Sequence, residues 1–289
     1  MAVTETTYSF IRAGRASRRD LFLRMPELSA LSDKVVAVFG LGCIGGPSAF
    51  ELVRAGVGEL RVLDHDIVDP GTIGRWPIGL SAAGVKKVDV VREVAGRDYP
   101  YVKVIPVNHR LGATRLNGPS DQEQLAKMTD GAQLIYDATT EWGVQHFLSE
   151  YARDREIPYI AVDGTQGGWG GRICRITPGQ TEGCWLCFQA ALTAATITPP
   201  AVGPDEDVQP EGCGDPTFKA AGFDMAQIAL AGVRVAVATL CRGIGGGYPP
   251  YPWDVTIMSF RDRGGELIAP RFDGYSLDKH NDCPRCGGQ

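Results

Sequence analysis

"VVAVFGLGCIGGPSAF", residues 35–50, begins as a run of branched apolar residues and continues through a glycine-rich turn into helix-compatible sequence. Gly40, Gly42 and Gly45 fit the spacing G-x-G-x-x-G, whose glycines permit a tight turn, close approach of a phosphate to backbone N–H groups, and tight packing of a helix on a strand. The stretch therefore predicts a nucleotide-binding strand, turn and helix. Hydride transfer and ATP chemistry both use such turns, so the turn alone does not choose between them.

Strand and helix patterns alternate from this stretch to residue 165, which is typical of a parallel sheet covered by helices on both faces. Strands are expected at 35–39, 59–64, 101–107, 132–137 and 158–163, and helices at 45–56, 81–97, 120–130 and 142–156. We expect an α/β fold with a doubly wound, Rossmann-like, mainly parallel sheet, and we take 35–165 as its nucleotide-binding half.

The flanking regions have different patterns. Residues 1–34 are rich in arginine and predict a short helical lead-in, although a solvated basic segment is the alternative. In 166–289, short strands with turns predict an antiparallel extension of the sheet. A proline-rich, acidic loop at about 193–217 precedes an apolar helix at 219–242. A loop of that length in a compact domain is usually a lid or a binding loop, or is disordered.

Composition narrows the class of protein. The chain has 289 residues, a net charge of −5 and a pI near 5.5. This charge argues against a nucleic-acid-binding protein, which usually has a basic face. We see neither an apolar stretch of the roughly 20 residues that span a bilayer nor the apolar core of a signal peptide. The expectation is a cytoplasmic protein with no membrane partner.

Charged residues after the second predicted strand favour ATP over NAD. Asp64, at the end of that strand, suits the ribose hydroxyls of an adenosine, although a carboxylate that only caps a turn is the alternative. The segment that follows holds Asp66, Arg75 and Lys87. An ATP attacked at its α-phosphate needs cations over the departing phosphates. Taken alone, each of the two cations is more often ordinary surface charge than a phosphate ligand, and no P-loop motif is present.

Two further groups of residues predict metal sites. Asp137 ends the strand expected on the other side of the first strand, which makes it a candidate Mg²⁺ ligand, with a helix N-cap as the alternative. Four cysteines form two C-x-x-C pairs about a hundred residues apart. The four, Cys184, Cys187, Cys283 and Cys286, suit a closed tetrahedral Zn²⁺ site that would clamp the C-terminal strands to the sheet. Two separate redox motifs are the rival interpretation.

Several ordered motifs together resemble the ThiF/MoeB/HesA adenylyltransferases, the superfamily that includes the ubiquitin-activating enzymes. The similarity is carried by "VVAVFGLGCIGG", "AGVGELRVLDHDIVD", "GRWPIG", "GVKKVD", "LIYDATT", "GCWLCF" and "CPRCGG", and covers roughly residues 35–289 as one adenylation domain. The resemblance implies adenylation of the C-terminal glycine of a small ubiquitin-fold protein, with MgATP and a structural zinc. It also implies a homodimer.

The resemblance assigns roles to single residues. It implies Asp64 on ribose, Arg75 and Lys87 on the phosphates, and Asp137 on magnesium. Lys86 competes with Lys87, which the following "KVD" favours. An N-terminal arginine of the partner protomer reaches the site in such dimers, and Arg15 is our choice.

The chain also departs from the family pattern. Thr72 and Trp76 replace the usual Asn and Gln of one motif, and Thr140 replaces an acid that follows Asp137. The loop at 193–217 corresponds to the family's crossover loop. Cys213 near its end is the candidate nucleophile if a thioester forms, with a structural thiol as the alternative. Residues 164–171 are a candidate floor for the channel that receives the partner's tail.

These observations favour an ATP-dependent adenylyltransferase that activates a ubiquitin-like or sulfur-carrier protein. Three alternatives stay open: adenylation of a carboxylate on a peptide or a tRNA base, an NAD-dependent oxidoreductase, and a scaffold that binds a ubiquitin-fold partner without using ATP.

Overall fold

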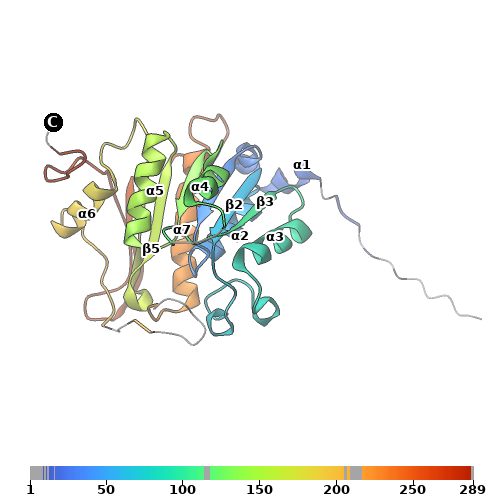
Figure 1. The fold of residues 1–289 in the computed structure, drawn as a ribbon, viewed down its shortest axis with the longest axis horizontal. Helices are drawn as coiled ribbons and strands as arrows, with labels where there is room; N and C mark the ends of the chain where they lie inside the picture. Colours follow the sequence, from blue (N-terminus) through green and yellow to red (C-terminus); the bar gives the residue numbers. More distant parts are fainter. Residues whose placement is uncertain are drawn as a thin grey trace, which may run out of the picture.

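The structure is a computed structural model that describes residues 9, 11, 13–15, 17–113, 118–204, 207–208 and 217–287. Their strands form one eight-stranded sheet of order β3-β2-β1-β4-β5-β6-β7-β8 (Figure 1). The strands are β1 (Val35–Phe39), β2 (Glu59–Asp64), β3 (Lys103–Asn108), β4 (Leu134–Asp137), β5 (Tyr159–Gly164), β6 (Gly170–Ile176), β7 (Val255–Arg261) and β8 (Leu267–Tyr275). The helices are α1 (Arg18–Leu21), α2 (Gly45–Ala55), α3 (Lys87–Asp98), α4 (Asp121–Thr129), α5 (Trp142–Asp154), α6 (Trp185–Thr193) and α7 (Gly222–Leu240).

The sheet has the doubly wound topology that the sequence predicts. Strands β1 to β5 are parallel, whereas β6, β7 and β8 pair antiparallel. The expected fold class, including the antiparallel extension, is confirmed. Because β1 lies between β2 and β4, the chain reverses direction across the sheet there. The carboxyl ends of strands at such a switch point line the ligand crevice.

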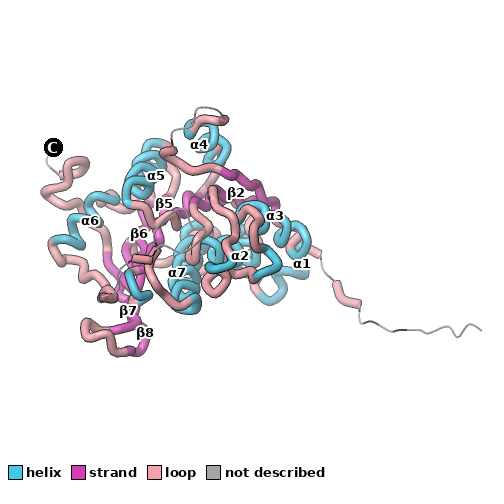
Figure 2. Tube along the Cα trace, turned by 60° about the horizontal axis from the view of Figure 1, so that its bottom comes forward, coloured by secondary structure: helices cyan, strands magenta, loops and turns pink. Residues whose placement is uncertain are grey.

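Alternating side chains of the central strands build two cores, one on each face. Val36 and Val38 of β1 pack with α2, α3 and α7, while Ala37 and Phe39 pack with α4, α5 and α6. Figure 2 shows the strands passing between α4 and α5 on one side and α2 and α7 on the other. All four side chains are fully buried, as expected for a central strand covered on both faces.

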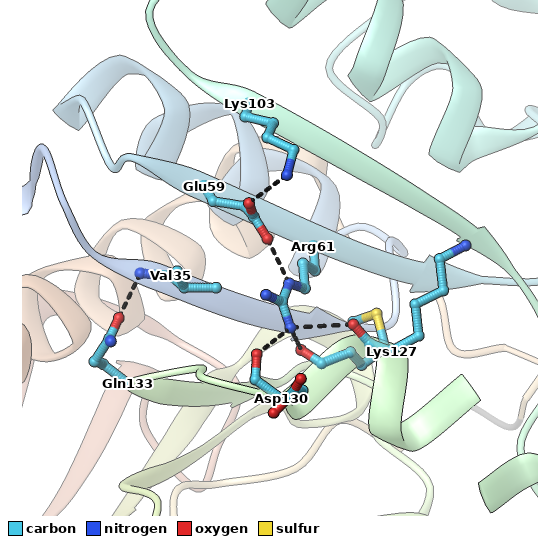
Figure 3. Close-up of polar contacts among 8 residues, drawn as sticks. Val35, Glu59, Arg61, Lys103, Lys127, Asp130 and Gln133 are labelled. Carbon is cyan, nitrogen blue, oxygen red and sulfur yellow. Dashed lines mark hydrogen bonds and ion pairs between the residues drawn. The ribbon is translucent and has the colours of Figure 1, made fainter. Parts of the chain in front are cut away.

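Polar contacts tie the strands together at their amino ends, away from the crevice (Figure 3). The Arg61 guanidinium donates to the carbonyls of Lys127, Met128 and Asp130 at 2.7–3.2 Å and to Glu59 at 2.6 Å. A cation there satisfies the free carbonyls at the C-terminus of α4 and complements its dipole. Lys103 also pairs with Glu59, at 2.8 Å, so these contacts join β2, β3 and α4.

Two helices differ from the sequence-based expectation. Helix α3 begins at Lys87 rather than near 81, because residues 66–86 form turns and short 3₁₀ segments around the crevice. Helix α6 was not predicted. It begins directly after Cys184, which is its N-cap residue, so the first C-x-x-C pair lies at its N-terminus. Its nine residues lack the polar face that marks a surface helix.

Helix α7 corrects one expectation about apolar stretches. Its 19 residues are long and apolar enough to cross a membrane by length and composition. However, 56% of the most apolar window is buried inside the domain, and Ile228, Val235 and Val237 pack against β-strands and α2 in the core. The core helix of a globular domain passes the same test, so α7 is weak evidence for a membrane span.

Candidate functional site

In the glycine turn between β1 and α2, each glycine is required or favoured for a different structural reason. Gly40 has a φ of +80°, and a Cβ there would lie 2.8 Å from the Ala138 carbonyl oxygen. A Cβ on Gly45 would lie 1.9 Å from the Gly40 carbonyl oxygen, so this position also excludes any side chain. Gly42 instead has open space where its Cβ would be and lines a cavity. The turn therefore presents bare backbone to a ligand.

Asp64 holds this turn in place. Its carboxylate accepts a hydrogen bond from the Leu41 backbone N–H at 2.6 Å and another from the Asp66 N–H at 2.7 Å. The structure therefore gives Asp64 a turn-stabilising role and also places it on the cavity wall. A carboxylate oxygen can accept more than one hydrogen bond, so these contacts leave acceptor capacity for a ligand hydroxyl.

Cationic side chains converge on the same cavity, whose volume is about 390 Å³. Lys87 is 8% exposed, and its ammonium lies 2.7 Å from a carboxylate oxygen of Asp66. Desolvation acts to raise the pKa of Asp66, but the charge and the hydrogen bond of Lys87 outweigh it and hold this pKa below its usual value. Arg75 is half-buried, and its guanidinium donates to the Phe218 carbonyl at 2.7 Å. Lys86, by contrast, is exposed at the N-cap of α3 and does not line the cavity.

Trp76, one of the two residues that depart from the motif described above, has a structural role. Its indole N–H donates to the Leu41 carbonyl at 2.7 Å, and a Cβ on Gly46 would lie 2.7 Å from the indole nitrogen. The indole ring therefore packs against the glycine turn and holds its backbone in place. Thr72, the other substituted position, lines the cavity.

Asp137 does not take the position that the sequence suggests. Its side chain is fully buried, and it is absent from the cavity wall. One carboxylate oxygen accepts from the backbone N–H and the hydroxyl of Thr139, at 2.9 and 2.7 Å, and the other accepts from the Tyr159 hydroxyl at 2.8 Å. In this geometry Asp137 fixes the loop after β4, and contact with a metal in the cavity would require it to leave these donors.

Burial of Asp137 predicts a pH-dependent stability. Desolvation raises the pKa of this carboxyl to about 6, partly opposed by the hydrogen bonds from Thr139 and Tyr159. Because the folded-state pKa is above the unfolded value, the native state binds the extra proton. The stabilisation that protonated Asp137 gives the native state is complete below about pH 4. It is lost as the pH rises through 6, and the free energy of unfolding falls by on the order of 3 kcal/mol.

The measurement is urea unfolding of the wild type and Asp137→Asn at pH 4.5, 5.5 and 7. The free energy of unfolding of the wild type, relative to the variant, should fall as the pH rises. A difference that is constant across this range would contradict the raised pKa.

The structure does not test two other predicted residues, Arg15 and Cys213. Arg15 is exposed, lies before α1 and does not line the cavity. Cys213 lies outside the described residues, so its role stays a prediction. The predicted loop at 193–217 is described in part: Val208 and Thr217 pair as an isolated antiparallel bridge, and Thr217 and Phe218 line the cavity.

Sequence reasoning missed residues after β3 and β4. His109 and Arg110 follow β3 directly and line the cavity, as does Glu141 after β4. His109 is 2% exposed and lies 2.6 Å from Asp121, which ties β3 to α4. Arg110 adds a third cation, whose charge also lowers the pKa of Asp66. Their signal was available, because charged residues that directly follow parallel strands lie at the crevice.

The four cysteines of the two C-x-x-C pairs come together next to the C-terminal end of α5. The sulfur atoms of all four lie within 4.8 Å of one another, with Cys184 3.8 Å from Cys187 and 3.6 Å from Cys283. A tetrahedral zinc with bonds of about 2.3 Å separates its sulfurs by about 3.8 Å, so the spacing fits. The set is suited to bind zinc.

Neighbouring groups donate to these sulfurs. Arg153, near the end of α5, donates to Cys286 at 3.7 Å, and the His280 backbone N–H donates to Cys187 at 3.4 Å. Donors of this kind stabilise metal-bound thiolates. Of the remaining described cysteines, Cys174 and Cys241 are buried as expected, whereas Cys43 is half-buried and lines the cavity.

Comparisons with known proteins identify the family of this chain. The model of the ThiF family matches residues 17–246, most of the chain. This chain belongs to the ThiF family. The ThiF-family chain is 33% identical to the uncharacterized protein y4qC of Sinorhizobium fredii over 96% of its length, which is 48% of that relative. It therefore spans about half the length of this relative, and likewise 47% of y4oA from the same organism.

More distant matches carry more specific names. Molybdopterin-synthase adenylyltransferase of Salmonella typhimurium is 29% identical over 170 residues, 58% of this chain and 64% of that protein. Among solved structures, E. coli MccB has a TM-score of 0.65 at 15% identity, covering 95% of this chain and 74% of MccB. This similarity shows a shared fold.

Proposed function

We propose that this chain is an ATP-dependent adenylyltransferase that activates the C-terminal glycine carboxylate of a small ubiquitin-like or sulfur-carrier protein. The observation that supports it most is the gathering of Arg75, Lys87 and Arg110 around one cavity with the glycine turn and Asp64. Three cations suit a triphosphate, whereas an NAD-dependent oxidoreductase gives no reason for them. Membership in the ThiF family and the similarity to molybdopterin-synthase adenylyltransferase agree with this proposal.

The proposed reaction joins two anions. A carboxylate oxygen of the partner attacks the α-phosphorus of ATP, the bond from that phosphorus to the bridging oxygen breaks, and pyrophosphate leaves with the bonding electrons. The product is an acyl-adenylate. Bare N–H groups of the turn would hold phosphate oxygens, and Lys87 and Arg75 would stabilise the departing charge, so catalysis is mainly positioning and electrostatic. Mg²⁺ bound with ATP would neutralise further phosphate charge.

A second hollow supports a route for the partner's tail. It has a volume of about 530 Å³ and is lined by Gly167, Trp169, Pro204, residues 219–221 and Arg261. Thr217 and Phe218, directly before these residues, line the first cavity. One loop segment therefore borders both spaces. Gly167 and Trp169 belong to the predicted channel floor, 164–171, and a diglycine tail suits a narrow passage because it lacks Cβ atoms.

The remaining parts of the proposal concern the assembly. Zn²⁺ bound by the four cysteines would hold the C-terminal segment, and Arg15 of a partner protomer would complete the site in a cytoplasmic homodimer. If the acyl group moves on to a thiol as a thioester, Cys213 is the candidate nucleophile. Zinc analysis, mass determination in solution and trapping of the thioester test these parts separately.

Exchange of labelled pyrophosphate into ATP tests the central reaction. The full chain should catalyse exchange only when a ubiquitin-fold carrier ending in Gly-Gly is present, and the same carrier without its final glycine is the control. A panel with a peptide acid and a tRNA with a carboxylated base tests the alternative acceptors. Exchange with none of these, or tight NADH binding instead, would rule the proposal out.

A further inference from the structure

The crevice contains several carboxylates, and the structure distinguishes them by what they already contact. We propose that Glu141 is the protein's carboxylate ligand for the Mg²⁺ that accompanies ATP. This inference rests on the proposed function. It assigns to Glu141 the role that the sequence suggested for Asp137, whose carboxylate is buried among Thr139 and Tyr159.

Most carboxylates on the cavity wall are already paired. Asp64 accepts backbone N–H groups with both oxygens. Asp66 lies 2.7 Å from the Lys87 ammonium and 3.3 Å from the His65 ring. Asp69 accepts the Gly71 N–H at 2.6 Å. The Glu141 side chain is exposed at the cavity and, among the residues that the structure describes, its carboxylate makes no hydrogen bond or ion pair. Among these four wall carboxylates, Glu141 is therefore the one with both oxygens available to a cation.

The loop after β4 explains how Glu141 reaches this position. Asp137 fixes Thr139 by two hydrogen bonds, and the next residue, Thr140, has a φ of +58°. A positive φ is a genuine outlier for a β-branched residue and costs of order 1–3 kcal/mol. It turns the chain so that Glu141 becomes the N-cap residue of α5, yet its side chain makes no cap hydrogen bond. The side chain is thus left at the crevice instead of closing the helix.

The chemistry of the cavity fits this ion. Magnesium takes oxygen ligands and is usually bound through one or two carboxylates together with substrate phosphates and waters. Glu141 follows β4, and Lys87 and Arg75 follow β2, so the glycine turn of β1 lies between them in the sheet. Phosphates at that turn would meet cations from one flank and a metal-binding carboxylate from the other.

A rival set exists on the β2 side. Ligand atoms of Asp64, His65 and Asp66 lie within 4.8 Å of one another. The ammonium of Lys87 next to Asp66 opposes a divalent cation there, because like charges at this distance repel. The geometry therefore favours Glu141 over this set, and the experiment below includes both.

Calorimetric titration of the full chain with ATP, in Mg²⁺ and in EDTA, measures how much the metal strengthens nucleotide binding. Glu141→Gln should lose at least the roughly 10- to 100-fold that one outer-sphere partner of a metal contributes, and its affinity in EDTA should stay unchanged. Glu141→Asp should keep part of the gain. Electron paramagnetic resonance of Mn²⁺ with ATP should show weaker binding of the ion to Glu141→Gln. Glu93→Gln, an exposed glutamate on α3, is the matched control.

Two results would overturn the inference. One is a Glu141→Gln variant that binds Mg·ATP and Mn²⁺ as the wild type does. The other is loss of the metal effect in Asp66→Asn together with its retention in Glu141→Gln. If the wild type binds ATP and either result is found, only the assignment of Glu141 fails. If the wild type does not bind ATP at all, the proposed function fails and the assignment fails with it.

Discussion

Replacing Lys87 by Ala should lower the rate of carrier-dependent pyrophosphate exchange by about 10²- to 10³-fold, the loss typical of a donor that stabilises developing transition-state charge. Lys87 is 8% exposed and lies on the cavity wall. A cation that is largely buried interacts with phosphate charge with little screening by water. The effect should fall mainly on kcat, because charge on the departing pyrophosphate grows in the transition state.

The neighbouring lysine supplies the control. Lys86 carries the same charge one position earlier, but it is exposed and absent from the cavity wall. Lys86→Ala should therefore retain activity within about twofold, as expected for a screened surface charge. Thermal unfolding of both variants checks that the chain still folds, because Lys87 also pairs with Asp66. Equal activity of the two variants would remove the phosphate role of Lys87.

The fold was predictable because its signals are local and repeat along the chain. Each parallel strand is a short apolar run followed by a helical pattern, and the glycine turn marks the first unit. Helix α6 escaped prediction because its amphipathic pattern is absent and its position depends on the cysteine cluster, a contact between distant segments. Such contacts leave no periodic signal in sequence.

The sequence predicted which strand ends form the site, but not the direction in which each side chain points. Asp64, Arg75 and Lys87 do reach one cavity. Asp137 also ends a strand at the correct edge, but its carboxylate turns inward to Thr139 and Tyr159, which sequence position cannot reveal. Thr140, in a left-handed conformation, then changes the direction of the chain. One backbone torsion therefore decides which acid after β4 faces the nucleotide cavity.

Loss of the cysteine cluster should have the largest effect on stability. We expect the purified chain to contain about one zinc per chain, and Cys184→Ser or Cys283→Ser to contain almost none. Structural zinc contributes roughly 10–16 kcal/mol of apparent binding free energy in small zinc-dependent peptides. Cys184 and Cys283 are 99 residues apart, so the ion would join the start of α6 to the C-terminal segment. Without it, the C-terminal segment around Cys283 loses the contact that joins it to α6.

The size of the loss follows from what surrounds the cluster. Besides the sulfurs, the C-terminal segment is tied to α5 by Arg285, which pairs with Glu150 at 3.0 Å, and an exposed ion pair contributes about 1 kcal/mol or less. Removing zinc should therefore lower the unfolding midpoint by about 10 °C or more, since a loss of several kcal/mol shifts it by roughly 2–4 °C per kcal/mol in a domain of this size.

Cys241 is a buried cysteine at the end of α7, outside the cluster, so the Cys241→Ser variant is the control and should still bind zinc. Chelation followed by metal analysis and calorimetry measures both quantities, and a wild type that holds no zinc and unfolds at the same temperature after chelation would refute the assignment.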